Sequence, residues 1–398
     1  DAGASVGPVL GILAICIAIC LVVAVGTAGA LQRCYQRHQS TLDALATSST
    51  VLLVTYQINV NLSKVHVYVG GESYGNPWDQ VIRIAEVVTL DAFDFFHADC
   101  AVESADYTLK LYLATLLPIS LAFIIMSFRV VWYKLFGGRV FDGTAVRVLL
   151  IILYWTLPST STVVASAFQC SYFDGGDEGV GGDGFVGFMT VDMTIPCGTD
   201  RHSWIRRYAT LMIFTFPVGV PAVITVLLWY RRREIEDRED RDGGPELRVL
   251  SLFFQSFAPE FWFMAPLDML RRLSLSSGLL AFNNKTTQIT VALFISAAYP
   301  LAMRELKPYF DQVSDRLSYI CGYEIFCSVL ALLFQDVRED LGIDSYLISW
   351  FLIVTNVGIV TLNGRLQYKQ TKVEKRVGVL QPQEAPEAQG GTAGEGGG

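Results

Sequence analysis

Nine long apolar blocks constrain this chain more than any other feature of its sequence. Each block is about twenty residues long, which is the length that a helix needs to cross a bilayer. Only 17% of the residues are charged, whereas soluble chains carry roughly 25%. The sequence therefore predicts an all-α fold, a polytopic bundle of about nine transmembrane helices over 1–370. The predicted spans are 8–30, 42–62, 108–128, 146–167, 208–230, 261–282, 287–303, 317–335 and 345–363.

The distribution of Lys and Arg predicts the orientation of the helices. If the N-terminus lies outside, the inner segments carry 20 of these residues and the outer segments carry five to seven. Cytoplasmic loops are enriched in Lys and Arg, so we expect the N-terminus outside and the C-terminus in the cytoplasm. Residues 371–398, rich in Gly, Ala, Glu and Pro, are expected to form a disordered cytoplasmic tail. The start at Asp1 rather than at Met predicts a further segment upstream.

Two features distinguish the segments assigned to the outer side. Residues 78–96 carry charges mostly three to five positions apart with apolar residues between them, which predicts an amphipathic helix on the outer surface. Cys170 and Cys197 flank one outer loop, and disulfides persist in that compartment. We expect a Cys170–Cys197 bridge that closes this loop. Cys100 then pairs upstream of Asp1 or remains free.

The sequence does not support catalysis or nucleic-acid binding. The chain has no GxSxG, no HExxH and no phosphate-binding loop, and its four histidines do not pair at metal-ligand spacing. A net charge of −8 is the opposite of what a nucleic-acid-binding protein needs. We therefore expect a protein that is not an enzyme and that has no cofactor.

The outer loop between the two cysteines is acidic. Several carboxylates close together suit Ca²⁺, although their spacing is not that of an EF-hand. A solvated acidic loop without a metal is the alternative. The weak candidate ligands are Asp174, Asp177, Glu178 and Asp183.

Charged residues within the predicted spans are functional candidates because they are costly in a bilayer. In 261–282, Asp268 can pair with Arg271 and Arg272 at positions i+3 and i+4; structural pairing and a gating or lipid-linked role remain alternatives. Glu324 in 317–335 either touches a permeating cation or bonds a neighbouring helix. In 208–230, Pro217 and Pro221 each remove a helix hydrogen bond and favour a kink.

Four short motifs resemble a family of large multi-pass proteins of algae, oomycetes and other protists. They are Leu157-Pro158-Ser159-Thr160-Ser161-Thr162, the segment from Thr190 to Cys197, Pro217-Val218-Gly219-Val220-Pro221 and Lys307-Pro308-Tyr309. In that family a long, Cys-rich ectodomain precedes the membrane region. The membrane region is similar to fungal transient-receptor-potential-like proteins and, more distantly, to polycystins. The resemblance implies a plasma or ciliary membrane protein.

The resemblance leaves two functions open. In the first, the chain is a cation-channel-like protein, in which 317–335 and 345–363 line the path and the chain forms a homo-oligomer. In the second, it is a non-conducting anchor for an extracellular or cell-surface assembly. Both imply contact with membrane lipids and with extracellular partner proteins or an upstream ectodomain. The loop from Gln335 to Asp344 is shorter than a re-entrant pore helix and filter require. The pore or cation candidates are Glu324, Asp336, Glu339, Asp340, Asp344 and Asn356.

Overall fold

The computed structural model of the chain describes residues 39–68, 75–88, 106–136, 143–174, 185–237, 247–282, 284–338 and 342–380. Several predictions lie outside these ranges: the span 8–30, Cys100, most of the acidic loop and residues 381–398. The elements are α3 (Gln39–Tyr68), α4 (Trp78–Val88), α7 (Tyr107–Phe136), α8 (Gly143–Ser166), β1 (Cys170–Asp174), β2 (Phe185–Met189), β3 (Asp192–Pro196), α9 (Asp200–Ile213), the π-helical turn η2 (Phe214–Gly219), α10 (Val220–Tyr230), α11 (Arg232–Glu236), α12 (Leu247–Phe254), the 3-10 turn η3 (Pro259–Phe261), α13 (Met264–Ser274), the 3-10 turn η4 (Leu279–Ala281), α14 (Lys285–Leu306), α15 (Gln312–Asp336) and α17 (Ser345–Leu380).

Among the described residues, six helical segments are long and apolar enough to cross a membrane. They are Tyr107–Ile125, Val146–Ser166, Asp200–Tyr230, Lys285–Leu306, Gln312–Asp336 and Ser345–Leu366. Each coincides with a predicted span. The chain is therefore an integral membrane protein built as a helical bundle.

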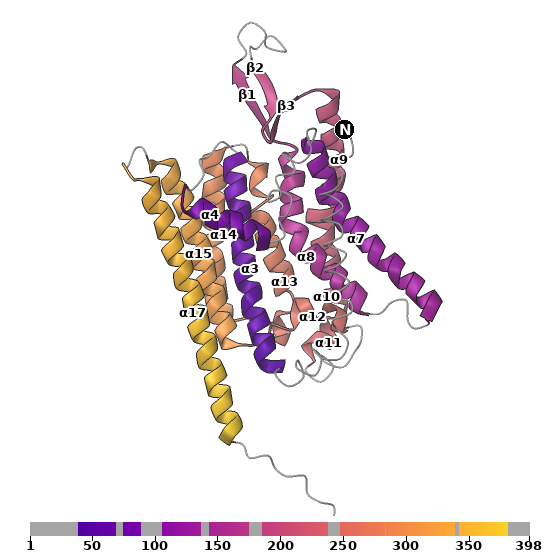
Figure 1. The fold of residues 1–398 in the computed structure, drawn as a ribbon, viewed down its shortest axis with the longest axis vertical. Coiled ribbons are helices and arrows are strands. Elements are labelled where there is room, and N and C mark those ends of the chain that lie inside the picture. Colours follow the sequence, from indigo (N-terminus) through magenta and orange to yellow (C-terminus); the bar gives the residue numbers. More distant parts are fainter. Residues whose placement is uncertain are drawn as a thin grey trace, which may run out of the picture.

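Helix α3 is as long as these segments but more polar. Gln57, Asn59, Asn61 and His66 interrupt its apolar sequence, and all four side chains are buried. They are buried because α3 packs against α8 and α15 inside the bundle (Figure 1). The predicted span 42–62 is thus an interior helix whose polar groups face other helices.

The bundle has two ends (Figure 1). The antiparallel sheet β1–β2–β3 and the turn between α15 and α17 lie at one end, which we call the hairpin end. Helices α11 and α12 and the turn between α14 and α15 lie at the other end, which we call the basic end. The name reflects the charged side chains gathered there: Arg231, Arg232, Arg233, Arg248, Arg304, Lys307 and Arg316.

The interior holds two hydrophobic cores. One joins α7, α8, α9, α10, α12 and α13 around side chains such as Leu157 and Phe216. The other joins α3, α4, α14, α15 and α17 around Ile58, Val329 and Leu352. Trp155 of α8 packs against both cores, so α8 links the two halves of the bundle.

The predicted span 261–282 is not one continuous helix, and this prediction was wrong in that respect. The segment consists of η3, the eleven-residue α13 and η4. It still runs from end to end. Ala258 donates its N–H to Pro308 at the basic end, while the Leu280 carbonyl accepts from Gln169 near the sheet. The break follows α13, where the N–H of Gly278 bonds back to Leu273 O at 2.8 Å.

The proline pair in the predicted span 208–230 marks a second irregularity. Residues 214–219 form a π-helical turn between α9 and α10, with Pro217 inside it. Proline removes a hydrogen bond and clashes with the preceding turn, and π turns of this kind are frequent where a helix kinks. The segment therefore crosses the bundle as two helices joined by a bulge.

Two further predictions are answered in part. In α4, Trp78, Ile82 and Ala85 are buried while Ile84 is 67% exposed; residues 89–96 of the predicted amphipathic helix lie outside the described ranges. Helix α17 continues as far as Leu380. The first ten residues of the predicted tail are therefore helical, consistent with their Lys and Glu residues, which are good helix formers.

Candidate functional site

Three charged side chains of α13 form a buried ion-pair cluster. Asp268 Oδ1 lies 2.8 Å from Arg271 Nη2, and Asp268 Oδ2 lies 3.3 Å from Arg272 Nε. Residues three and four apart share one helix face, so one carboxylate reaches both guanidinium groups. The Arg272 side chain is only 1% exposed. This cluster carries a net charge of +1 inside the bundle.

Side chains from other helices surround the two guanidinium groups. Arg271 Cζ lies 3.5 Å from the ring centroid of Tyr299, and Arg272 Cζ lies 4.0 Å from that of Tyr154. Arg272 Nη1 also donates to Gln57 Oε1 at 3.3 Å. Cation–π contacts gain strength where water is excluded. The tyrosines and Gln57 thus replace part of the hydration that the arginines lose on burial.

A second cluster surrounds Glu324, in the half of the bundle that contains the core of Ile58, Val329 and Leu352. Asn59 Nδ2 donates to both carboxylate oxygens at 3.0 Å, Ser328 Oγ donates at 3.0 Å, and Asn356 Nδ2 donates at 2.9 Å. Glu324 is 3% exposed and Asn356 is 6% exposed. The predicted candidates Glu324 and Asn356 are therefore in direct contact, and they join α3, α15 and α17.

The Glu324 carboxylate is bound by neutral donors alone. Among the described residues, no Lys, Arg or His lies within ion-pair distance of it. Asn59 Oδ1 is buried beside it without a hydrogen-bond partner. A buried carboxylate is costly unless a proton, a cation or a distant opposite charge compensates it. The arrangement is a hydrogen-bonded buried carboxylate rather than an ion pair, and both roles predicted for Glu324, contact with a cation and bonding to neighbouring helices, fit it.

Of the acidic candidates around the α15–α17 turn, the structure describes Asp336 and Asp344. Asp336 lies 2.8 Å from Lys285 Nζ and 3.2 Å from His66 Nε2. Asp344 accepts the N–H of Tyr346 at 3.0 Å, as a cap at the start of α17. Glu339 and Asp340 lie outside the described residues.

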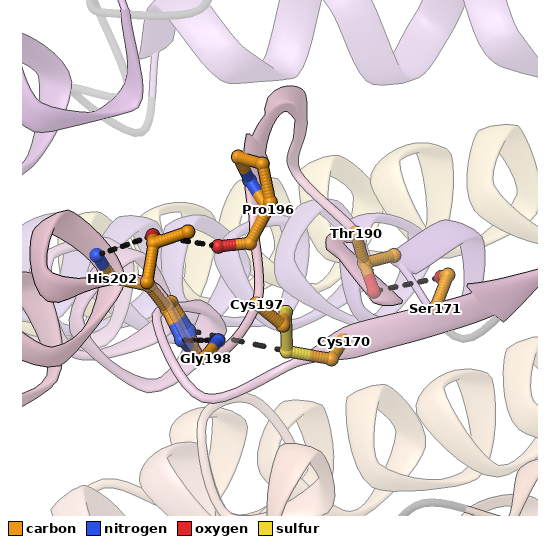
Figure 2. The surroundings of a disulfide bond; sticks show 8 residues. Cys170, Ser171, Thr190, Pro196, Cys197, Gly198 and His202 are labelled. Atoms are coloured by element: carbon orange, nitrogen blue, oxygen red, sulfur yellow. Dashed lines mark hydrogen bonds between the residues drawn. A yellow bond between two sulfur atoms is a disulfide. The ribbon is translucent and has the colours of Figure 1, made fainter. Parts of the chain in front are cut away.

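The Cys170–Cys197 disulfide is present, with the two Cα atoms 6.5 Å apart. It joins the start of β1 to the turn after β3, and His202 lies beside it (Figure 2). His202 Nε2 is 3.9 Å from Cys170 Sγ. These three residues place their potential ligand atoms within 4.8 Å of one another, but sulfurs joined in a disulfide are not the thiolates that bind metals.

The calcium candidates are not brought together by the described part of the chain. Asp174 is the last residue of β1. Asp177, Glu178 and Asp183 lie in the range 175–184, outside the described residues. The predicted Ca²⁺ site therefore stays a prediction.

The sheet is attached to the bundle through Asp192. Its Oδ2 accepts the N–H of Tyr107 at 3.0 Å, and its Oδ1 accepts the hydroxyl and the N–H of Thr194 at 2.6 and 3.0 Å. Partial burial alone would raise the pKa of Asp192, but these hydrogen bonds outweigh it and hold the pKa of that carboxyl below its usual value. Arg201 of α9 also pairs with Asp106 before α7.

Sequence reasoning missed the partners that complete both clusters. Gln57 and Asn59 lie in one predicted span, Tyr154 and Tyr299 in two others. An available signal was the run Gln57, Asn59 and Asn61, three carboxamides within five residues of an otherwise apolar block. Polar residues within spans usually face the bundle interior, so this run marked α3 as a central helix.

Comparison with models of known protein families, with curated proteins and with solved structures finds no match to this chain. The function must therefore be inferred from the two buried clusters themselves.

Proposed function

We propose that the protein is a cation-channel-like membrane protein of the transient-receptor-potential type, in which Glu324 is the residue that meets the cation. The observation that supports this is the Glu324 carboxylate, held at membrane depth by neutral donors from α3, α15 and α17. Carboxylates inside membrane domains usually mark ion or proton pathways. Amide and hydroxyl oxygens nearby are ligands that hard cations prefer.

The charge distribution supports an orientation for this proposal. The segments assigned to the inner side, which include those of the basic end, carry 20 Lys and Arg residues against five to seven in the outer segments, whereas the hairpin end carries the disulfide. Cytoplasmic ends are rich in Lys and Arg, and disulfides persist outside the cytosol. We place the basic end in the cytoplasm and the hairpin end outside, at the plasma or ciliary membrane.

A specific observation favours the second candidate, the non-conducting anchor. Helices α15 and α17 pack against each other and are joined by residues 337–344 alone. A re-entrant pore helix and filter need a longer connection at 1.5 Å rise per residue. If the protein conducts, the path must therefore run beside Glu324 rather than through a re-entrant loop between these helices.

Cation flux into proteoliposomes tests the proposal. We expect Glu324→Gln to change the cation flux or selectivity by at least about tenfold, which corresponds to about 1.4 kcal/mol. Glu305→Gln is the matched control, because Glu305 is exposed on α14, and it should leave the flux unchanged.

Two results would count against the proposal in different ways. The absence of any cation flux from wild-type protein under stretch, Ca²⁺ and voltage would leave the non-conducting anchor as the better interpretation. A flux that Glu324→Gln leaves unaltered, while thermal unfolding shows that the variant is folded, would keep conduction but refute Glu324 as the residue that meets the cation.

A further inference from the structure

A polar cavity of about 50 Å³ lies among α3, α12, α13, α14 and α15. Thr47, Thr50 and Ser256 line it and are partly exposed, whereas Ser318 and Cys321 line it and are each 2% exposed. The Asp268–Arg271 ion pair of α13 also lines it. Ser256 follows α12 and accepts the N–H of Phe310 from the α14–α15 turn. The cavity therefore runs inward from the basic end. One water needs about 10–15 Å³ of such a cavity, so a few waters fit.

The buried wall of this cavity is one helical turn from Glu324. Cys321 precedes Glu324 by three residues on α15, and Thr55 precedes Asn59 by four residues on α3; such residues share a helix face. Cys321 and Thr55 both line the cavity. The Thr55–Cys321 pair thus forms a polar layer between the cavity and the Asn59–Glu324 pair.

The interior on the hairpin side of Glu324 is packed mostly by apolar side chains. Leu62, Val329, Leu332 and Leu352 are at most 2% exposed and belong to one hydrophobic core. The cavity beside Leu62, Val329 and Leu332, which His66 and Gln288 also line, measures only about 10 Å³, so it holds at most one water. This layer separates Glu324 from Asp336 at the hairpin end.

We propose that, in the closed conformation described here, Glu324 exchanges a small cation with water from the basic end, through the cavity that ends at Ser318 and Cys321, while the layer on the hairpin side is shut. The route lies within a single chain. It deepens the proposed function and rests on Glu324 as the cation site, because it names the side from which that site is reached. The polar layer of Thr55 and Cys321 is the last step before the carboxylate.

The reactivity of the native Cys321 thiol measures access along this route, so no residue that lines the route has to be substituted. The full chain is reconstituted in vesicles, and 2-aminoethyl methanethiosulfonate, a small cationic thiol reagent, is added to one side while a thiol scavenger is trapped on the other. Mass mapping of the Cys321 peptide then gives the rate of modification. We expect fast modification when the basic end faces the reagent, and modification at least about tenfold slower from the hairpin end.

Val329→Cys supplies the matched control. Val329 lies on the same helix, is as buried as Cys321 and is on the other side of Glu324. We expect this new thiol to react at least about tenfold more slowly than Cys321 from the basic end. A second variant, Ser318→Leu, fills the cavity and should slow the modification of Cys321, with thermal unfolding as the check that it folds.

Equal rates for Cys321 and the Val329→Cys thiol would overturn the proposal, as would equal rates for Cys321 from both sides. The result is independent of conduction. Fast modification of Cys321 in a protein without cation flux would refute the channel function and keep the proposed route. Cation flux in a protein whose Cys321 does not react would refute the route and keep the channel function.

Discussion

Replacing Asp268 by Asn tests how the ion-pair cluster of α13 contributes to stability. The substitution keeps the size of the side chain but removes the charge that both arginines share. Asp268 is 17% exposed, Arg271 9% and Arg272 1%, so water screens the cluster only weakly.

The magnitude follows from what the substitution leaves behind. Removing one partner of a buried ion pair costs about 3–5 kcal/mol, because a charge stays buried without compensation. Here the stacking of Arg271 on Tyr299 and of Arg272 on Tyr154 is retained, and Asn still accepts hydrogen bonds. We therefore expect a loss near the lower limit, about 3 kcal/mol.

A triple variant separates charge compensation from ordinary packing. Replacing a complete buried ion cluster by apolar residues of similar volume is often neutral or stabilising. Asp268→Leu combined with Arg271→Met and Arg272→Met should therefore destabilise the protein less than Asp268→Asn alone. If each lost contact simply added to the destabilisation, the triple variant would instead be the less stable of the two.

Unfolding in mixed micelles titrated with SDS, followed by tryptophan fluorescence, measures both differences. Glu305→Gln, an exposed carboxylate on α14, controls for the loss of a negative charge. The reasoning fails if Asp268→Asn unfolds within about 1 kcal/mol of wild type, or if the triple variant is the less stable of the two.

Three further predictions concern the hairpin end and the topology. Replacing both Cys170 and Cys197 by Ser should lower the unfolding free energy by about 3.5 kcal/mol on the chain-entropy model, for a sequence separation of 27 residues; equal SDS midpoints with and without the bridge would contradict this. Hydrogen bonds depress the pKa of Asp192 below its usual value in the folded chain. Its ionised form therefore stabilises the protein above the pKa of the unfolded chain, and this contribution is lost as the pH falls through the lower pKa of the folded chain. The stability difference between wild type and Asp192→Asn should therefore shrink on acidification, and a pH-independent difference in unfolding midpoint would refute the assignment. Finally, a C-terminal tag in intact cells should resist external protease, whereas its digestion would reverse the proposed orientation.

The sequence by itself determined where most helices lie. An apolar block of about twenty residues has few ways to satisfy its backbone hydrogen bonds in a bilayer other than as a helix. This is why α7, α8, α14, α15 and α17 lie close to their predicted positions. The disulfide that closes the loop between Cys170 and Cys197 could also be predicted, because both cysteines fall in one segment assigned to the oxidising side.

The block 261–282 shows the limit of hydropathy. Its apolar composition predicts one helix, but composition does not register the break after Ser274, where Gly278 bonds back to Leu273. The same block carries Asp268, Arg271 and Arg272, and only their packing against other helices makes such a short helix stable in the interior. Local patterning cannot report on those neighbours.

Only the tertiary structure decided which polar groups meet. Asn59 and Glu324 are 265 residues apart, and Gln57 and Arg272 are 215 residues apart. Helical periodicity relates residues three and four apart and says nothing about which helices become neighbours. Hydropathy thus placed Asp268, Arg271, Arg272 and Glu324 within predicted spans, while the packing of α3 between α8, α15 and α17 brought Arg272 and Glu324 to their partners.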